Sequence, residues 1–320
     1  MSDSPSKSDG LATEVVDSDT EAASFTRDDF MSLTKARLSM LVVVTTLAGY
    51  IVGVRTGLGP FSGWLLLHTI LGTTLAAFGS AVFNQLMEVD ADSRMKRTAG
   101  RPLPAQRIPP GVAFVLGWLL SGFGVVHLGK MVNTESSALA AVTLVVYLFI
   151  YTPMKRRSVL NTLVGAISGA IPPVIGYAAA AGAGSDGIRW ELFIEPGALF
   201  LFGLLFFWQL PHFLAINWMY REEYVKGGFV MWSNSDETGA ATGFRAVYYS
   251  VALLLTTAVP PFIGLSSWWF LPPALLTAGY MVFLSFRLWK FPDRLTARKL
   301  FFYTLLYLPV VLGAFLVFVM

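Results

Sequence analysis

The chain has 320 residues, of which 55% are hydrophobic and 13% are charged. A soluble protein of this size normally carries about 25% charged residues, so the composition excludes an ordinary soluble domain and indicates a polytopic membrane protein. The chain contains no cysteine, which excludes disulfides, thiolate metal sites and cysteine nucleophiles.

Residues 1–31 differ from the rest because they are rich in Ser and Asp and poor in apolar residues. This composition predicts a disordered tail. The segment lacks the apolar core of a signal peptide, and it is too acidic for a mitochondrial transit peptide. We therefore expect a bacterial inner (plasma) membrane protein, in which residues 32–320 form one transmembrane domain.

The apolar runs predict an all-α fold of nine transmembrane helices, each near the roughly 20 residues needed to cross a bilayer. Their expected ranges are 38–55, 62–89, 110–130, 136–153, 159–182, 192–219, 244–265, 268–288 and 299–319.

Lys and Arg are concentrated in the N-terminal segment and in every second loop, whereas the other side has Arg55, Lys130 and Arg189. Loops rich in Lys and Arg remain in the cytoplasm. The pattern therefore predicts a cytoplasmic N-terminus and, after an odd number of spans, a periplasmic C-terminus.

Asn84, Glu88 and Asp92 are spaced by four where the second span ends, so they share one face of a helix, and Asp90 points elsewhere. Carboxylates at this depth are costly unless they face a polar cavity or bind something. Two carboxylates and an amide oxygen are hard ligands that suit Mg²⁺ with phosphate oxygens. An ordinary solvated helix end is the alternative for this segment alone.

A second polar segment, "WQLPHFLAINWMYREEYVKGG", ends the sixth span on the same side of the membrane. The segment between them, "YLFIYTPMKRRSVLNT", also reaches that side. Cavity candidates from these two segments are Tyr147, Tyr151, Asn161, Trp208, Gln209, Asn217 and Lys226. The Gly/Ala/Pro run 165–176 indicates close helix contact or a broken helix beside a cavity.

These segments resemble the UbiA-type intramembrane prenyltransferase superfamily. Asn84, Glu88 and Asp92, followed by "MKRTAGRPLP", are similar to its first Asn/Asp-rich motif, although Gln85 follows the Asn and Glu88 replaces the middle Asp. The second motif has His212 where many members have Asp, with Glu222 and Glu223 as the paired acids. Together with "YTPMKRRSVLNT" and "GAIPPVIGY", these departures resemble the protoheme IX farnesyltransferase (haem O synthase) branch.

The resemblance implies a central cavity that opens to the cytoplasmic side, Mg²⁺ as cofactor, farnesyl diphosphate and haem B as substrates, and haem O as product for haem-copper oxidases. It implies Mg²⁺ ligation by Asn84, Glu88 and Asp92, with Glu223 or Glu222 serving a second ion. The implied partners are these substrates, membrane lipid, and haem A synthase or oxidase assembly factors, but no nucleic acid.

Five cations are candidate diphosphate ligands: Lys96, Arg97, Arg101, Lys155 and Arg156. The alternative for each is a topology signal that faces anionic lipid. His212 is a candidate catalytic residue, and three roles stay open: ligand of the haem iron, propionate contact, or base for a water step.

Three other functions remain as alternatives. The first is a related enzyme that prenylates a quinone precursor, against which the Asp-poor second motif argues. A transporter should instead carry its acidic residues near the middle of the bilayer, with a path to both sides. A haem-handling protein without catalytic activity would not need the metal-binding stripe.

Overall fold

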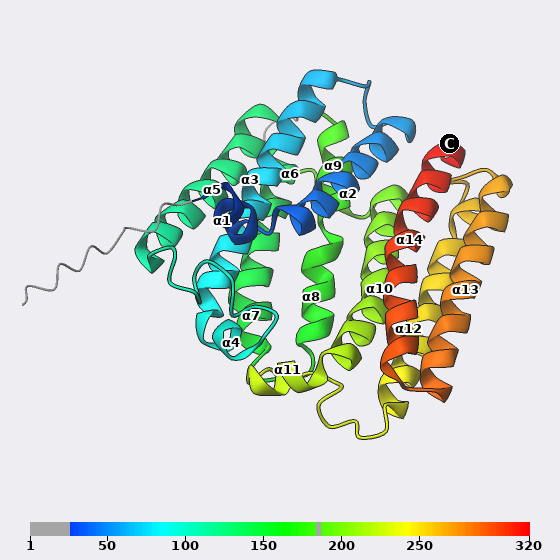
Figure 1. The fold of residues 1–320 in the computed structure, drawn as a ribbon. Helices are drawn as coiled ribbons and strands as arrows, with labels where there is room; N and C mark the ends of the chain where they lie inside the picture. Colours follow the sequence, from blue (N-terminus) through cyan, green and yellow to red (C-terminus); the bar gives the residue numbers. More distant parts are fainter. Residues whose placement is uncertain (1–25, 184–186) are drawn as a thin grey trace, which may run out of the picture.

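The computed structural model describes residues 26–183 and 187–320. Within these residues, nine helices are long and apolar enough to cross a membrane. They lie side by side in one bundle (Figure 1). Their bounds are Ala36–Arg55, Gly63–Met87, Pro110–Met131, Thr134–Met154, Asn161–Ala180, Pro196–Met219, Ala240–Ile263, Trp268–Lys290 and Arg294–Phe318. The predicted all-α fold and the nine spans are confirmed, with boundary shifts of a few residues.

Five spans consist of a single long helix: α2 (Ala36–Arg55), α3 (Gly63–Met87), α5 (Pro110–Met131), α10 (Pro196–Met219) and α14 (Arg294–Phe318). In the seventh span, α12 (Ala240–Ala258) is followed by a 3-10 turn, Pro260–Ile263. α13 (Leu271–Lys290) follows a 3-10 turn, Trp268–Phe270, in the eighth span. These helices satisfy their backbone groups internally, as the lipid environment demands.

The fourth span changes its helical type near its end. After α6 (Thr134–Val145) comes a π-helical turn, η1 (Val146–Tyr151), and then α7 (Thr152–Met154). The Thr152 hydroxyl donates to the Tyr147 carbonyl oxygen over 2.8 Å. Such π-turns inside α-helices are frequent at functional sites.

The fifth span is broken into α8 (Asn161–Ala170) and α9 (Pro172–Ala180), which meet at Ile171. α9 packs closely on α2 because Gly49 and Gly176 leave the space: a Cβ at Gly49 would lie 1.8 Å from the Pro173 carbonyl oxygen. Both features expected of the 165–176 run, close contact and a broken helix, are present.

One end of the bundle carries short helices and long loops. We call it the capped end and define it by α1 (Arg27–Leu33), α4 (Val89–Arg94), α11 (Arg221–Lys226) and loop 95–109. α1 begins at Arg27 with a capping box from Thr26, and Asp29 accepts a 2.8 Å ion pair from Arg107. The predicted tail boundary at residue 31 is therefore too late, because this helix can bury Leu33. Residues 1–25 lie outside the described residues.

The apolar core lies mainly among α10, α12, α13 and α14, which stand together on one side of the bundle (Figure 1). The rings of Phe200, Phe270 and Phe315 meet there, with centroids 4.4 to 6.4 Å apart. Within this core, α10 packs on α12 and α14, and another face of α10 forms one wall of the cavity described next.

Candidate functional site

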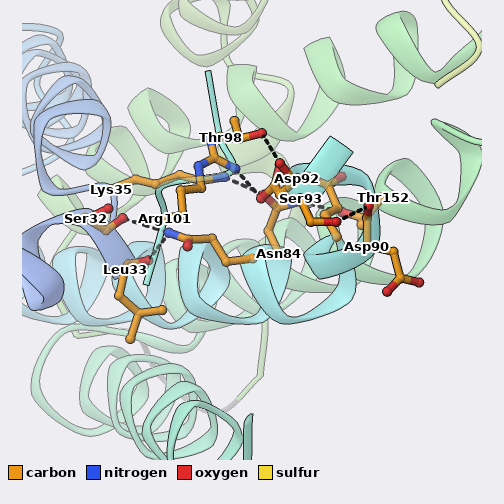
Figure 2. Close-up of polar contacts among 12 residues, drawn as sticks. Ser32, Leu33, Lys35, Asn84, Asp90, Asp92, Ser93, Thr98, Arg101 and Thr152 are labelled. Carbon is orange, nitrogen blue, oxygen red and sulfur yellow. Dashed lines mark hydrogen bonds and ion pairs between the residues drawn. The ribbon is translucent and has the colours of Figure 1, made fainter. Parts of the chain in front are cut away.

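Asn84, Glu88 and Asp92 lie together at the capped end, almost fully buried at 0%, 5% and 1% exposure. The sequence predicts that they share one continuous helix, but α3 ends at Met87 and α4 starts at Val89. The spacing of four survives, since the amides of Glu88 and Asp92 still donate to the carbonyl oxygens four residues earlier. Asp90 is exposed, and its carboxylate points away from the cluster (Figure 2).

Each of the three oxygen-bearing side chains contacts a cation from another segment. Lys35 donates to the Asn84 Oδ1 atom, the Lys155 Nζ atom lies 2.7 Å from Glu88 Oε1, and Arg101 lies 2.5 Å from Asp92 Oδ2. Figure 2 shows the Lys35 and Arg101 side chains converging on Asn84 and Asp92. The cluster therefore pairs buried acceptors with partly buried cations rather than exposing a solvated helix end.

Lys35 is a site residue that the sequence analysis missed. It has left-handed backbone angles, φ 48° and ψ 44°, which are uncommon for a residue with a side chain and typical of strained functional positions. Burial, together with the nearby Arg101, lowers its pKa to about 7. A Lys directly before an apolar span was the available signal, but the same signal marks an ordinary topology determinant.

The Glu88–Lys155 pair is held in its ionised form. Burial alone would raise the pKa of Glu88, but the charges of Lys155 and Lys35 keep it below its ordinary value. Burial would likewise lower the pKa of Lys155, and Glu88 keeps it above its ordinary value. Each buried charge is therefore stabilised by the other, as a buried ion pair requires.

A polar chamber of about 200 Å³ lies in front of this cluster. It collects residues from both motif segments and from the loop between them. The predicted site residues that line it are Glu88, Asp92, Arg97, Arg101, Tyr151, Lys155, Asn161 and Asn217. Asn84 does not line the chamber; it accepts a hydrogen bond from Lys35 and donates one to the Thr152 hydroxyl. The Asn217 side-chain nitrogen is buried without a partner among the described residues, so it is available to a ligand.

An apolar chamber of about 310 Å³ continues from the polar one into the bundle. The two chambers share the lining residues Lys35, Leu38, Tyr151 and Phe213. Among the predicted cavity candidates, Tyr147 and Gln209 line the apolar chamber. Small residues of α3 and α8 form much of its wall. Gly169 lets α8 approach α10, since a Cβ there would lie 2.0 Å from the Gln209 Oε1 atom.

His212 and Trp208 face away from both chambers. The His212 ring is stacked between Trp208 and Phe301, and its Nδ1 atom lies 2.7 Å from the Thr304 hydroxyl. The Trp208 indole nitrogen donates to the Thr304 carbonyl oxygen. One residue on a helix corresponds to about 100°, so the face of α10 with Gln209 and Phe213 meets the cavity while the adjacent face meets α14.

Other predicted residues also lie outside the chambers. Glu222 and Lys226 line a separate surface hollow with Asp236 and Glu237. Lys96 and Arg156 are exposed and line neither chamber. Glu223 is half-buried, and its carboxylate accepts the Arg97 backbone N–H over 3.2 Å, so it supports the loop that carries Arg97.

The donor set fits a hard divalent cation bound together with an anionic substrate. Among residues 26–183 and 187–320, no three His, Asp or Glu side chains lie close enough to hold a metal ion alone. Glu88 and Asp92 with the Asn84 amide instead supply the one or two carboxylates that Mg²⁺ uses when phosphate oxygens and water complete its coordination. The adjacent cations match the phosphates themselves.

Comparison with known proteins gives a consistent result. Residues 42–307 match the UbiA prenyltransferase family. The protoheme IX farnesyltransferase of Solibacter usitatus is 41% identical over 298 residues, which cover 90% of this chain and 97% of the relative. The mitochondrial protoheme IX farnesyltransferase of Homo sapiens is 38% identical over 282 residues, 88% of this chain and 60% of the relative.

Solved structures share the fold. Digeranylgeranylglyceryl phosphate synthase superposes with a TM-score of 0.72 at 15% identity, covering 91% of this chain and 97% of that one. A UbiA homolog from Archaeoglobus fulgidus, bound to GPP and Mg²⁺, gives 0.61 at 14% identity, covering 90% and 99%.

Proposed function

This chain belongs to the UbiA prenyltransferase family, and we propose that it transfers the farnesyl group of farnesyl diphosphate to a vinyl group of haem B, forming haem O. The observation that carries the proposal is the junction of two chambers. A buried acid–base cluster, suited to a diphosphate, opens into an apolar chamber suited to an isoprenoid chain. A substrate with an anionic head and an apolar tail matches both at once.

Asn84, Glu88 and Asp92 would hold Mg²⁺, because they place two carboxylates and an amide beside the polar chamber. The UbiA homolog from Archaeoglobus fulgidus was solved with GPP and Mg²⁺, which supports a role for Mg²⁺ in general but does not identify its ligands here. When bound, the metal neutralises charge that develops on the leaving diphosphate. Glu223 is not assigned to a second ion, because its carboxylate holds the loop before Arg97.

Lys35, Arg101 and Lys155 are positioned to bind the diphosphate. Each lines the polar chamber and each already donates to one of the buried oxygen atoms. Donors fixed in a water-poor site before the reaction stabilise developing negative charge far better than donors in water. Arg97, exposed at the chamber's edge, completes the set.

The reaction breaks the bond between farnesyl C1 and the diphosphate oxygen, and the electron pair leaves with diphosphate. The vinyl group of the haem then supplies the electron pair for the new bond to C1, and water adds to the resulting side-chain cation with loss of a proton, leaving a hydroxyl. The apolar walls near Tyr147 and Phe213 keep water from the allylic cation until the haem captures it.

The capped end would face the cytoplasm of a bacterial inner membrane, with the C-terminus in the periplasm. The support is the distribution of Lys and Arg, which gather in the loops of that end. This orientation would present the chambers to water-soluble farnesyl diphosphate.

Product analysis tests the proposal. Purified protein with haem B, farnesyl diphosphate and Mg²⁺ should give a farnesylated hydroxyethyl haem by mass spectrometry, and chelation of the metal should abolish it. Asp92→Asn should lower turnover at least about 100-fold, whereas Asp90→Asn, with the same charge change on the same short helix, should retain it. An unchanged haem, with a prenylated phenol in a parallel reaction, would overturn the assignment.

A further inference from the structure

A third cavity, which the proposed function does not yet use, lies beside the two chambers at the capped end. It encloses about 590 Å³ between α1 and the start of α2. We call it the basic hollow and define it by its lining residues, Arg27, Asp28, Met31, Ser32, Lys35, Arg37, Leu38 and Arg101. Four cations and one carboxylate give it a strong positive balance.

The basic hollow is continuous with the site. Lys35 and Leu38 line the basic hollow, the polar chamber and the apolar chamber alike, and Arg101 lines the first two. A molecule lying in the basic hollow would therefore extend one of its edges to the point where the diphosphate head and the isoprenoid tail would meet.

Two of the cations have no partner among residues 26–183 and 187–320. Lys35 and Arg101 are bonded to Asn84 and Asp92, but Arg27 and Arg37 make no hydrogen bond, ion pair or aromatic contact with any described residue. Both side chains are exposed. Free guanidinium groups at the rim of a cavity are suited to bidentate binding of carboxylates.

The apolar residues of the basic hollow also need an explanation. Met31 is 43% exposed and Leu38 is 68% exposed, although both border a cavity lined by cations. Exposed apolar residues are ordinary on a membrane span such as the one that carries Leu38, but Met31 and Leu38 also line the hollow beside Arg27 and Arg37. A ligand with an apolar flat body and carboxylates at one edge would contact both kinds of residue, and methionine sulfur packs well on aromatic rings.

We propose that the basic hollow binds the propionate edge of haem B, with Arg27 and Arg37 as the carboxylate partners and Met31 and Leu38 against the porphyrin. Haem B carries its vinyl groups on the edge opposite its propionates, so this placement directs the vinyl edge toward Lys35 and the two chambers. The inference rests on the proposed function, because it assigns the acceptor of that reaction to a location.

The test combines protein variants with a modified acceptor. Protein in phosphatidylcholine vesicles, with saturating farnesyl diphosphate and Mg²⁺, is assayed with haem B and with its dimethyl ester. Arg27→Gln/Arg37→Gln should raise KM for haem B about tenfold, as expected for loss of a charge-assisted contact. Neither kcat nor KM for farnesyl diphosphate should change. In the unmodified protein, KM for the dimethyl ester should exceed KM for haem B by a similar factor. In the double variant, KM for the ester should rise no further.

The control variant Arg157→Gln/Arg287→Gln removes two exposed charges from the same end and should behave like the unmodified protein. Asp28→Asn should lower KM for haem B, because it removes the one carboxylate among the lining residues of the basic hollow, which would repel the propionates. If the Arg27→Gln/Arg37→Gln substitutions raised KM for haem B and KM for its dimethyl ester by the same factor, the inference would be overturned. So would a loss seen only when anionic lipid is added, which would assign the hollow to a lipid headgroup. If the unmodified protein makes no farnesylated haem, the proposed function itself fails.

Discussion

At the scale of single residues, the pair Glu88–Lys155 combines a structural and a functional role. Glu88 is buried, the Lys155 side chain is 12% exposed, and their charged atoms lie 2.7 Å apart. Removing one member of a buried ion pair leaves an uncompensated charge, which typically costs about 3–5 kcal/mol. The proposed metal ligand Glu88 and the proposed diphosphate ligand Lys155 would therefore also contribute to the stability of the capped end.

Glu88→Gln should lower the unfolding temperature in detergent at pH 7, because it leaves Lys155 charged and unpaired. The pKa of Glu88 is lowered in the folded chain, so its stabilising effect is present above the ordinary value of about 4.3 and is lost as pH falls through the folded pKa. The difference between variant and unmodified protein should therefore narrow below about pH 4. A constant difference from pH 3 to pH 8 would contradict this, and Asp90→Asn serves as the control.

His212 should act on stability rather than on turnover. His212→Phe and Thr304→Val should each lower the unfolding temperature, and the double variant should lose less than the sum, because the two side chains share one hydrogen bond. Values of kcat should stay within about tenfold, that is within roughly 1.4 kcal/mol of activation free energy. A much larger fall in kcat with an unchanged unfolding temperature would restore a catalytic role for His212.

Residue types and spacing in the sequence predict part of this site and leave the rest undetermined. The spacing of Asn84, Glu88 and Asp92 places three oxygen-bearing side chains on one side even across a helix break. Lys35 and its contact with Asn84 depend on how the ends of α2 and α3 pack, which local sequence does not specify. The misplacement of His212 has the same origin, since a rotation of α10 by one residue decides between the cavity and α14.

At the scale of elements, we expect the wall formed by α3 to determine which isoprenoid chains fit the apolar chamber. Thr73, Ala77 and Ser80 line the apolar chamber on successive turns of that helix, each turn rising about 5.4 Å. Thr73 is farthest from the Asn84 end. Because these side chains are small and lie one turn apart, a larger side chain at any of them would shorten the chamber at that level.

Thr73→Phe should fill the deep end of the chamber. We expect kcat/KM to fall at least about tenfold with farnesyl diphosphate, while the shorter geranyl diphosphate is retained, because small changes in an apolar pocket give about 10- to 200-fold discrimination. Ser80→Phe should impair both substrates. Thr74→Phe, on the next residue and outside the lining, is the control. Equal losses for both chain lengths in Thr73→Phe would refute this assignment of the wall.

The elements themselves are largely predictable because long apolar runs in lipid have few alternatives to helix. The positions where these helices are interrupted are harder to predict from the sequence. Pro172 and Pro173 signal the interruption of the fifth span, but nothing comparable marks the end of α3 at Met87. The predicted tail, residues 1–31, includes the first five residues of α1, because their polar composition does not reveal the Asp29–Arg107 ion pair with loop 95–109.

At the scale of the whole molecule, the account requires the capped end to face the cytoplasm. The absence of native cysteine allows a direct test with single-cysteine variants. Arg157→Cys, at the capped end, should react with a membrane-impermeant maleimide only after the membrane is permeabilised. Lys130→Cys, at the opposite end, should react in intact spheroplasts. The reverse labelling pattern would show that the chambers open to the periplasm.

The arrangement of the whole bundle also explains why one end carries the chemistry. The second, fourth and sixth spans all finish there, so α4, α7 and α11 lie together at that end (Figure 1), and α1 contributes residues to the basic hollow next to the start of α2. The opposite half, with α12, α13 and α14, contributes packing rather than lining.

The central claim is that one divalent cation, held by Asn84, Glu88 and Asp92, binds the diphosphate where the polar and apolar chambers meet. A structure of the protein with Mn²⁺ and the unreactive S-thiolodiphosphate analogue of farnesyl diphosphate tests this most directly. We expect an anomalous manganese signal between Glu88 and Asp92, with the isoprenoid chain running past Tyr151 and Phe213 toward Thr73. A metal or diphosphate bound elsewhere, with the chambers empty, would contradict it.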